Sequence, residues 1–170
     1  MTVKIRPEHP GDAAAIYAVH ASCFPTSAEA ALVDSLRMAG RLSVSLVAEI
    51  DGQIVGHVGF SPVSAEGARD GVGLAPVAIT ESHRRRGIAE QLIRQGLAAC
   101  RDAGFRWCVV LGEPAYYQRF GFRPAPSFGL SDEYGGGDAF QALELAPGGI
   151  PLGAGLVRYA PEFAIFGQAE

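Results

Sequence analysis

The stretch from Val72 to Leu111 constrains the fold of this chain more than any other part of it. Val72 to Thr80 is an apolar segment typical of a strand, and Trp107 to Leu111 is a continuous apolar run typical of a buried parallel strand. Gly104 ends a helix between them, whose apolar face is formed by Ile88, Leu92, Ile93, Gly96, Leu97 and Cys100. Strand, helix and strand in this order imply a right-handed crossover between parallel strands, and so an α/β protein.

A hairpin precedes this crossover. Val44 to Ile50 and Gln53 to Val63 are separated by Asp51-Gly52, the pair best suited to a type I′ turn. The small and polar residues from Ser64 to Gly71 predict a loop. Pro76 interrupts the strand that follows, and a proline inside a strand requires an edge, a bulge or a local opening of the sheet.

The two ends of the chain predict shorter elements. Asp12 is a candidate N-cap for the first of two amphipathic helices. The expected elements are a strand at Thr2–Arg6, helices at Ala13–Cys23 and from Ala28, a short helix at Ala115–Phe120 ended by Gly121, and strands at Phe140–Leu145 and Gly155–Tyr159.

Composition bounds the class of protein. A length of 170 residues with 48% hydrophobic and 19% charged residues predicts one domain, residues 1–170. A net charge of -4 disfavours nucleic-acid binding. No apolar run approaches a membrane span or a signal-peptide core, so we expect a cytoplasmic protein. Cysteines at 23, 100 and 108, without a Cys-x-x-Cys pair, exclude a disulfide framework or the usual zinc spacing.

The only basic cluster lies between the Pro76 strand and the helix that follows. Arg84, Arg85 and Arg86 are followed by the small residues Gly87 and Ala89. Small residues let a ligand approach the backbone, and the first turn of a helix offers free N–H groups to an anion. The pattern alone is weak, because a solvated basic helix start would look the same. The glycine-rich fingerprints of mononucleotide and dinucleotide folds are absent.

Two motifs in order resemble the GNAT superfamily of N-acetyltransferases. The first is Arg84-x-x-Gly87-x-Ala89, between a strand and a helix, and the second is the segment from Ala115 to Phe122, Ala-Tyr-Tyr-Gln-Arg-Phe-Gly-Phe. Phe60–Val63, Gly73–Ala78 and Leu111–Ala115 resemble more narrowly the YhbS-like subgroup. The resemblance covers nearly the whole chain. It implies a single domain whose mixed, twisted sheet of about seven strands, flanked by about four helices, contains a splayed parallel pair.

The resemblance implies acetyl-CoA as cosubstrate. It places the backbone amides of the turn on the pyrophosphate of acetyl-CoA, and Ile79 at the position whose backbone pairs with the pantetheine arm. The arm would then lie as an added strand in the gap where two parallel strands diverge. A strand that bends away from its neighbour can tolerate the missing N–H of Pro76. The backbone around Ala78 and Ile79 would polarise the acetyl carbonyl. The full set of expected cofactor-binding residues is Val77, Ala78, Ile79, Arg84, Arg85, Arg86, Gly87, Ile88, Ala89 and Tyr117.

Tyr117 matches the family's general acid. Its phenol is protonated at neutral pH, since an unperturbed tyrosine has a pKa of about 10, and could donate to the leaving CoA thiolate. The alternative is that Tyr116 and Tyr117 are only packing residues before a turn that ends at glycine. For Tyr116 we prefer this structural role.

The general base does not carry over, because the glutamate of histone-type members is replaced here by Gly73. The candidates are Glu113, at the end of a strand that should face the cleft, and His57, whose residue type titrates near neutral pH. A lone histidine in an apolar strand is more often structural. Glu49, Glu81 and a water relay remain open.

The expected function is transfer of an acetyl group from acetyl-CoA to the amine of a small molecule or a protein, by direct attack on the thioester, with no metal. The alternative is a non-catalytic acyl-CoA sensor or scaffold, which Gly73 favours and Tyr117 disfavours. A third reading, a binder of another nucleotide, leaves Pro76 and Tyr117 unexplained. We expect a monomer or a homodimer that binds neither nucleic acid nor a membrane.

Overall fold

The computed structural model describes residues 2–167 and forms two compact units. The first unit holds the chain up to Phe60 together with Ala75–Ala99, and the second holds Ser61–Leu74 together with the chain from Cys100 onward. Strands β3 (Gln53–Ala65) and β4 (Ala68–Ile79) contribute residues to both. Neither unit is therefore a continuous piece of the chain.

Antiparallel strands form the sheet of the first unit. β1 (Lys4–Pro7) pairs with β2 (Val44–Ile50), and β2 pairs with β3 from Val44 opposite Phe60 to Ile50 opposite Gln53. Asp51 and Gly52 both have positive φ, 50° and 80°, as a type I′ turn requires. The predicted hairpin is confirmed.

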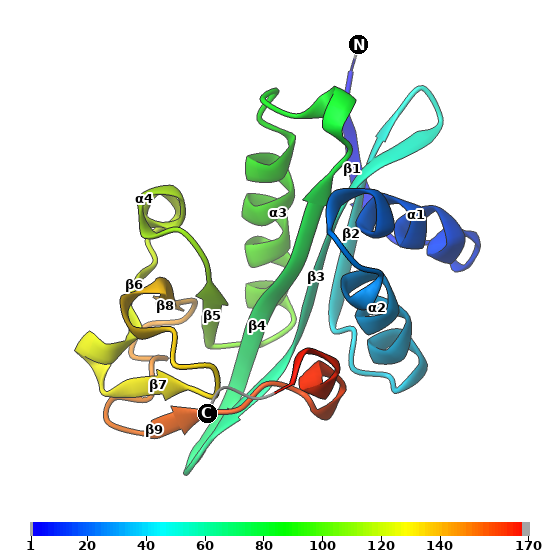
Figure 1. The fold of residues 1–170 in the computed structure, drawn as a ribbon. Helices are drawn as coiled ribbons and strands as arrows, with labels where there is room; N and C mark the ends of the chain where they lie inside the picture. The colour runs from blue at the N-terminus through cyan, green and yellow to red at the C-terminus, as the bar shows by residue number, and fades with distance from the viewer. Residues whose placement is uncertain (1, 168–170) are drawn as a thin grey trace. The chain divides into compact units, whose positions relative to one another are not determined.

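Helices cover both faces of these strands (Figure 1). α1 (Ala13–Cys23) and α2 (Ala28–Met38) lie on one face, where Ile16, Val33 and Val47 form a buried cluster. α3 (Ile88–Asp102) lies on the other, and a Cβ on Gly56 of β3 would be 3.2 Å from Leu92 of that helix. Successive strand residues point to opposite faces, so one strand serves both layers.

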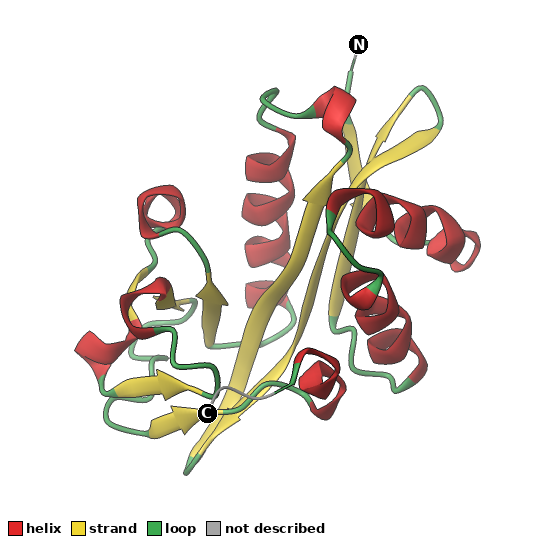
Figure 2. Cartoon of the chain, viewed as in Figure 1, coloured by secondary structure: helices red, strands yellow, loops and turns green. Residues whose placement is uncertain are grey.

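The second unit is built from short elements (Figure 2). β4 pairs in parallel with β5 (Trp107–Leu111), β5 pairs antiparallel with β8 (Phe140–Glu144), and β8 pairs with β6 (Arg123–Pro124). β7 (Leu130–Asp132) and β9 (Gly155–Val157) form a separate parallel pair. α4 (Pro114–Tyr117) is one turn long. Further 3₁₀ turns of the chain lie at Pro10–Asp12, Glu81–His83, Gln118–Phe120, Ala125–Phe128, Gly137–Ala139 and Pro161–Phe166.

Strand pairing follows the order β1-β2-β3-β4-β5-β8-β6 in a mixed, seven-stranded sheet. The predicted α/β class is confirmed. The parallel pairing of β4 with β5 covers three residue pairs, from Gly71 with Trp107 to Gly73 with Val109, although β4 extends to Ile79. This short pairing matches the splayed pair that the family resemblance implies.

The prediction of a loop at Ser64–Gly71 is wrong. β3 continues to Ala65 and β4 begins at Ala68, so a tight turn with Gly67 at a φ of 69° joins two long strands. Polar residues here reflect exposed strand ends, which a hydropathy pattern does not separate from a loop. Within residues 2–167, no helix has both the length and the apolar character of a membrane span.

Candidate functional site

The turn before α3 has the backbone of an anion site. After the 3₁₀ turn at Glu81–His83, Arg85 and Gly87 adopt left-handed φ angles of 64° and 75°, and the helix begins at Ile88. Alternating backbone conformations of this kind turn successive N–H groups toward one side. The first N–H groups of α3 also lack intrahelical partners, and the helix dipole adds positive potential there.

The side chains around this turn leave its surface open. Arg84, Arg85 and Arg86 are exposed, and a Cβ on Gly87 would meet nothing within 4 Å. The Arg84 guanidinium donates to the Ile79 carbonyl at 3.0 Å, so it fastens the turn to the end of β4. An anion held by the backbone would therefore be surrounded by positive charge.

The end of β4 is fixed from three sides. Ile79 O also accepts a hydrogen bond from the Cys23 thiol at 3.2 Å, and Thr80 N donates to Val55 O at 2.8 Å. Ala78 and Ile79 are buried, whereas Val77 is half-buried. The structure thus brings the predicted residues at 77–79 and 84–89 together within the first unit.

Tyr117 lies in the second unit, at the end of α4, and is nearly buried. Its ring packs edge-on against Phe122 and against Tyr116, and a Cβ on Gly112 would lie 2.4 Å from it. Burial, with contributions from Tyr116 and Cys108, raises the pKa of Tyr117 to about 12. The phenol is therefore neutral throughout the physiological range and can donate a hydrogen bond.

Glu113 is the exposed N-cap of α4. Its carboxylate accepts from Ala115 N at 3.5 Å, and its carbonyl accepts from the backbone N–H groups of Tyr116 and Tyr117. These contacts begin the turn that carries Tyr117. Glu113 therefore has a structural role in the second unit, and its role as a base stays a prediction.

His57 is completely buried on β3. Its Nδ1 lies 2.8 Å from Nε2 of His20, and its Nε2 lies 2.8 Å from the Ser45 hydroxyl. Burial, followed by the charges of His20 and Arg37, lowers the pKa of His57 well below the usual value. Direct contact between His57 and a substrate would require these hydrogen bonds to open, and its role as a base stays a prediction.

Gly73 is enclosed by an aromatic cluster of the second unit. A Cβ at this position would lie 2.8 Å from the Tyr159 ring and 3.0 Å from Val63. Tyr159 packs on Phe163 with ring centroids 4.9 Å apart. The space that a glutamate side chain would need is thus occupied by a ring. The missing carboxylate is visible in the sequence, but no sequence pattern points to Tyr159, which lies far along the chain.

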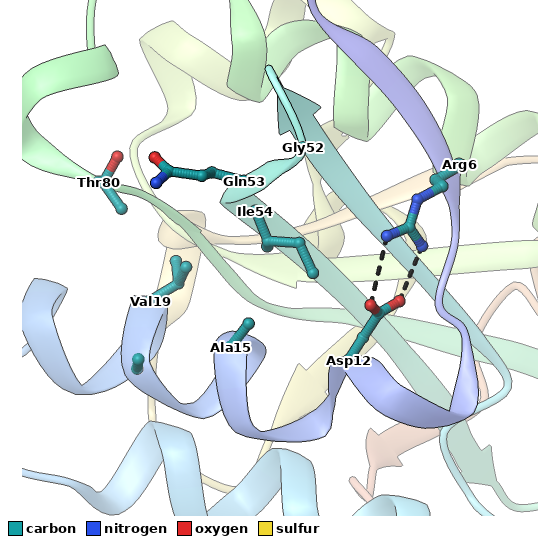
Figure 3. Close-up of a pocket in the computed structure, with 9 residues that line it drawn as sticks. Arg6, Asp12, Ala15, Val19, Gly52, Gln53, Ile54 and Thr80 are labelled. Carbon is teal, nitrogen blue, oxygen red and sulfur yellow. Dashed lines mark hydrogen bonds and ion pairs between the residues drawn. The ribbon is translucent and has the colours of Figure 1, made fainter.

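A pocket of about 510 Å³ opens on the first unit beside α1 (Figure 3). Arg6 in its wall bridges Asp12 at 2.7 Å and Glu49 at 2.9 Å. None of the predicted site residues lines it, and its strongest charges already pair with one another. The hydrogen bonds of Arg6 and of His9 N lower the pKa of Asp12 to about 2. The ion pairs hold β1, β2 and the start of α1 together.

Comparisons with known proteins agree with the two motifs. Residues 13–122 match the family described as the acetyltransferase (GNAT) family. The chain is 42% identical to YhbS of Escherichia coli K12, named as an uncharacterized N-acetyltransferase, over 95% of this chain and 99% of that protein.

Two solved structures are also similar. The crystal structure of Escherichia coli YhbS in complex with CoA has a TM-score of 0.92 at 41% identity, over 98% of this chain and 94% of that one. A GNAT acetyltransferase from Brucella melitensis in complex with acetyl-CoA has a TM-score of 0.80 at 40% identity, over 95% of this chain and 98% of that one. With motifs, fold and relatives in agreement, this chain belongs to the GNAT family of acetyltransferases.

Proposed function

We propose that the protein transfers the acetyl group of acetyl-CoA to an amine, through direct attack of the amine on the thioester. The main support for this proposal is the turn from Arg84 to Ala89. The backbone of the turn is open to a ligand, and a long helix begins directly at Ile88. Two relatives at 40% identity or more were crystallised with CoA or acetyl-CoA. The acceptor would be a small molecule or a protein amine.

The cofactor would be held by backbone more than by side chains. The N–H groups of Arg85, Arg86, Gly87, Ile88 and Ala89 would bind the pyrophosphate, and the three exposed arginines would add attraction. The pantetheine arm would pair with β4 at Val77–Ile79, as an added strand. The backbone there would then polarise the acetyl carbonyl as negative charge develops on its oxygen.

Tyr117 would serve the leaving group. As the C–S bond breaks, the phenol O–H donates to the thiolate sulfur. A thiol has a usual pKa of about 8.5, below the value of Tyr117, so complete proton transfer is uphill and the hydrogen bond itself supplies most of the stabilisation. Glu113 is the exposed candidate for accepting the amine proton, directly or through water.

A non-catalytic acyl-CoA-binding module is the second candidate. The packing of Tyr159 on Gly73 favours it, since the carboxylate of histone-type members has no room in this chain. A sensor would bind acetyl-CoA but would release no CoA when amines are added. For either function we place the protein in the cytoplasm and treat residues 1–170 as one domain.

Two measurements on the full-length protein separate these candidates. Isothermal titration calorimetry with acetyl-CoA should show one saturable site, and a panel of primary amines should then release free CoA above the rate seen without amine. Binding without release supports the sensor. A folded protein that does not bind millimolar acetyl-CoA contradicts both functions.

A further inference from the structure

Gly112 lies where the chain leaves β5 and enters α4, and one of its backbone groups lacks its strand partner. β5 ends at Leu111, and Gly112 N extends the pairing with the chain before β8 by donating to Ala139 O at 3.0 Å. Opposite residues of an antiparallel pair exchange two hydrogen bonds, so Ala139 N would be the expected donor to Gly112 O. Ala139 N instead donates to Gly136 O at 3.1 Å, within the 3₁₀ turn before β8.

The side chain of Gln141 takes the place of that missing donor. Gln141 lies on β8 and is 1% exposed. Its Nε2 donates to Gly112 O at 3.2 Å and to Ala139 O at 3.3 Å. Both partners are carbonyl oxygens, which only accept, so the nitrogen of the amide must face them. Both polar backbone groups of Gly112 are therefore held by residues 139–141.

The other end of the Gln141 amide does not oppose this contact. Gln141 lines a pocket of about 460 Å³ together with Pro114 and Pro124. The amide oxygen is turned away from the two carbonyls, so it is the atom of this side chain that can meet solvent in the pocket. Gln141 thus has no polar atom that is buried without a partner.

Gly112 in turn supports the hydroxyl end of the Tyr117 ring. A Cβ on Gly112 would lie 2.4 Å from Cε2 of Tyr117 and 3.4 Å from Cζ, the carbon that bears the hydroxyl. Phe122 and Tyr116 pack edge-on against the ring, with centroids 5.8 Å and 5.1 Å away. No hydrogen bond to a described residue holds the hydroxyl itself. Its position therefore depends on what the ring rests on, and a shift of Gly112 would move it.

We propose that Gln141 is a positioning residue for Tyr117, which holds Gly112 against the start of β8 and so fixes where the phenol O–H points. This inference rests on the proposed role of Tyr117 toward the leaving thiolate. Gln141 itself would touch neither acetyl-CoA nor the acceptor, and it would exchange no proton. Placement matters because a displacement of about 1 Å at a reacting group can lower a rate about 100-fold.

Gln141→Met tests this role, because methionine keeps an unbranched side chain of similar size and lacks both N–H donors. CoA release and the Kd for acetyl-CoA are measured for wild type, Gln141→Met and the control Gln118→Met, an exposed glutamine on the neighbouring 3₁₀ turn. We expect Gln141→Met to lower kcat about tenfold and to leave the Kd unchanged. The control should match the wild type in both. An unchanged kcat in a folded Gln141→Met protein would overturn the positioning role.

A double-mutant cycle with Tyr117→Phe separates positioning from a general structural defect. If Gln141 acts through the Tyr117 hydroxyl, Gln141→Met should cause no further loss of kcat in the Tyr117→Phe protein, because the group that it positions is gone. A tenfold loss in both backgrounds would show that Gln141 only supports the fold, and the proposal would be wrong.

Hydrogen exchange in the wild-type protein gives a readout that needs neither turnover nor a variant. The side-chain amide protons of Gln141 should exchange with water about tenfold or more slowly than those of the exposed Gln118, because both are bound to carbonyl oxygens. Equal exchange rates would overturn the proposal even if Gln141→Met failed to fold. Failure of the wild type to release CoA with any amine would contradict the proposed function, and with it any role of Gln141 in turnover, whereas slow exchange would still show the contact with Gly112.

Discussion

Tyr117 illustrates how one residue can be suited to a role by its surroundings. Its ring rests on the backbone of Gly112 and between aromatic neighbours, so its hydroxyl is held in one place. Burial keeps the phenol neutral. A neutral donor that meets charge only as the reaction proceeds stabilises the transition state more than the ground state.

Tyr117→Phe should therefore lower kcat about 100-fold and leave the Kd for acetyl-CoA nearly unchanged. The substitution removes only the hydroxyl, so packing of the ring is preserved. Tyr116→Phe is the matched control, because it removes the hydroxyl of the neighbouring, half-buried ring. The measurements are CoA release and calorimetric titration. Full turnover by the Tyr117→Phe protein would remove the leaving-group role.

Among single residues, the sequence could reveal those whose signal is local. The arginines at 84–86, Gly87 and Tyr117 stand in contiguous motifs, and the structure places the first group on one turn. The pairing of His20 with His57 joins residues 37 positions apart, on a helix and a strand. No periodicity or spacing reports such a pair, because it depends on how α1 packs on the sheet.

At the scale of elements, the turn before α3 has a useful counterpart in the same unit. Gly87 and Gly52 both have positive φ, 75° and 80°, and a Cβ at either would meet nothing within 4 Å. They differ in place: Gly87 precedes the helix, whereas Gly52 forms the tip of the hairpin. A comparison of the two separates backbone strain from ligand contact.

Gly87→Ala and Gly52→Ala should each lower the free energy of unfolding by about 1–2 kcal/mol, the cost of a left-handed backbone for a residue with a Cβ. Only Gly87→Ala should weaken acetyl-CoA binding, by about tenfold or more, because its methyl group would stand where the pyrophosphate approaches the backbone. Urea denaturation and calorimetry provide the two numbers. Equal affinities for the two variants would show that the cofactor does not use this turn.

Elements with strong local patterns were predictable and the others were not. The hairpin at Asp51-Gly52 and helix α3 follow from turn chemistry and apolar spacing, and both lie where predicted. β6 at Arg123–Pro124 and β7 at Leu130–Asp132 were missed. They are two and three residues long, and they exist because distant strands pair with them rather than because of their own propensity.

For the whole molecule, two buried neutral histidines make stability depend on pH. An unfolded histidine takes up a proton near pH 6.5, but His20 in the folded chain does so only near pH 4. Between these values the unfolded state binds more protons than the folded state, so stability falls as pH falls. His57 acts in the same direction.

The free energy of unfolding should accordingly decline from pH 6.5 to pH 5, with a slope of up to about 1.4 kcal/mol per pH unit for each histidine. His20→Gln should reduce the slope, while His9→Gln, at an exposed position, should not. A flat profile would contradict the burial of neutral histidines.

Trp107, the only tryptophan, lies in the second unit and the histidines lie in the first. If residues 1–170 behave as one domain, the fluorescence of Trp107 should report the same unfolding midpoints as circular dichroism at every pH. Separate unfolding midpoints would contradict a single domain.

The contact between Tyr159 and Gly73 also bears on how this chain could change over generations. A glutamate at 73 alone would overfill the cluster, and a smaller residue at 159 alone would leave a cavity in it. Either order of two single mutations passes through a less stable intermediate. The two positions are thus coupled, and a carboxylate at position 73 requires a smaller residue at position 159. Exchange of glycine for glutamate at this strand is therefore a change of two residues rather than one.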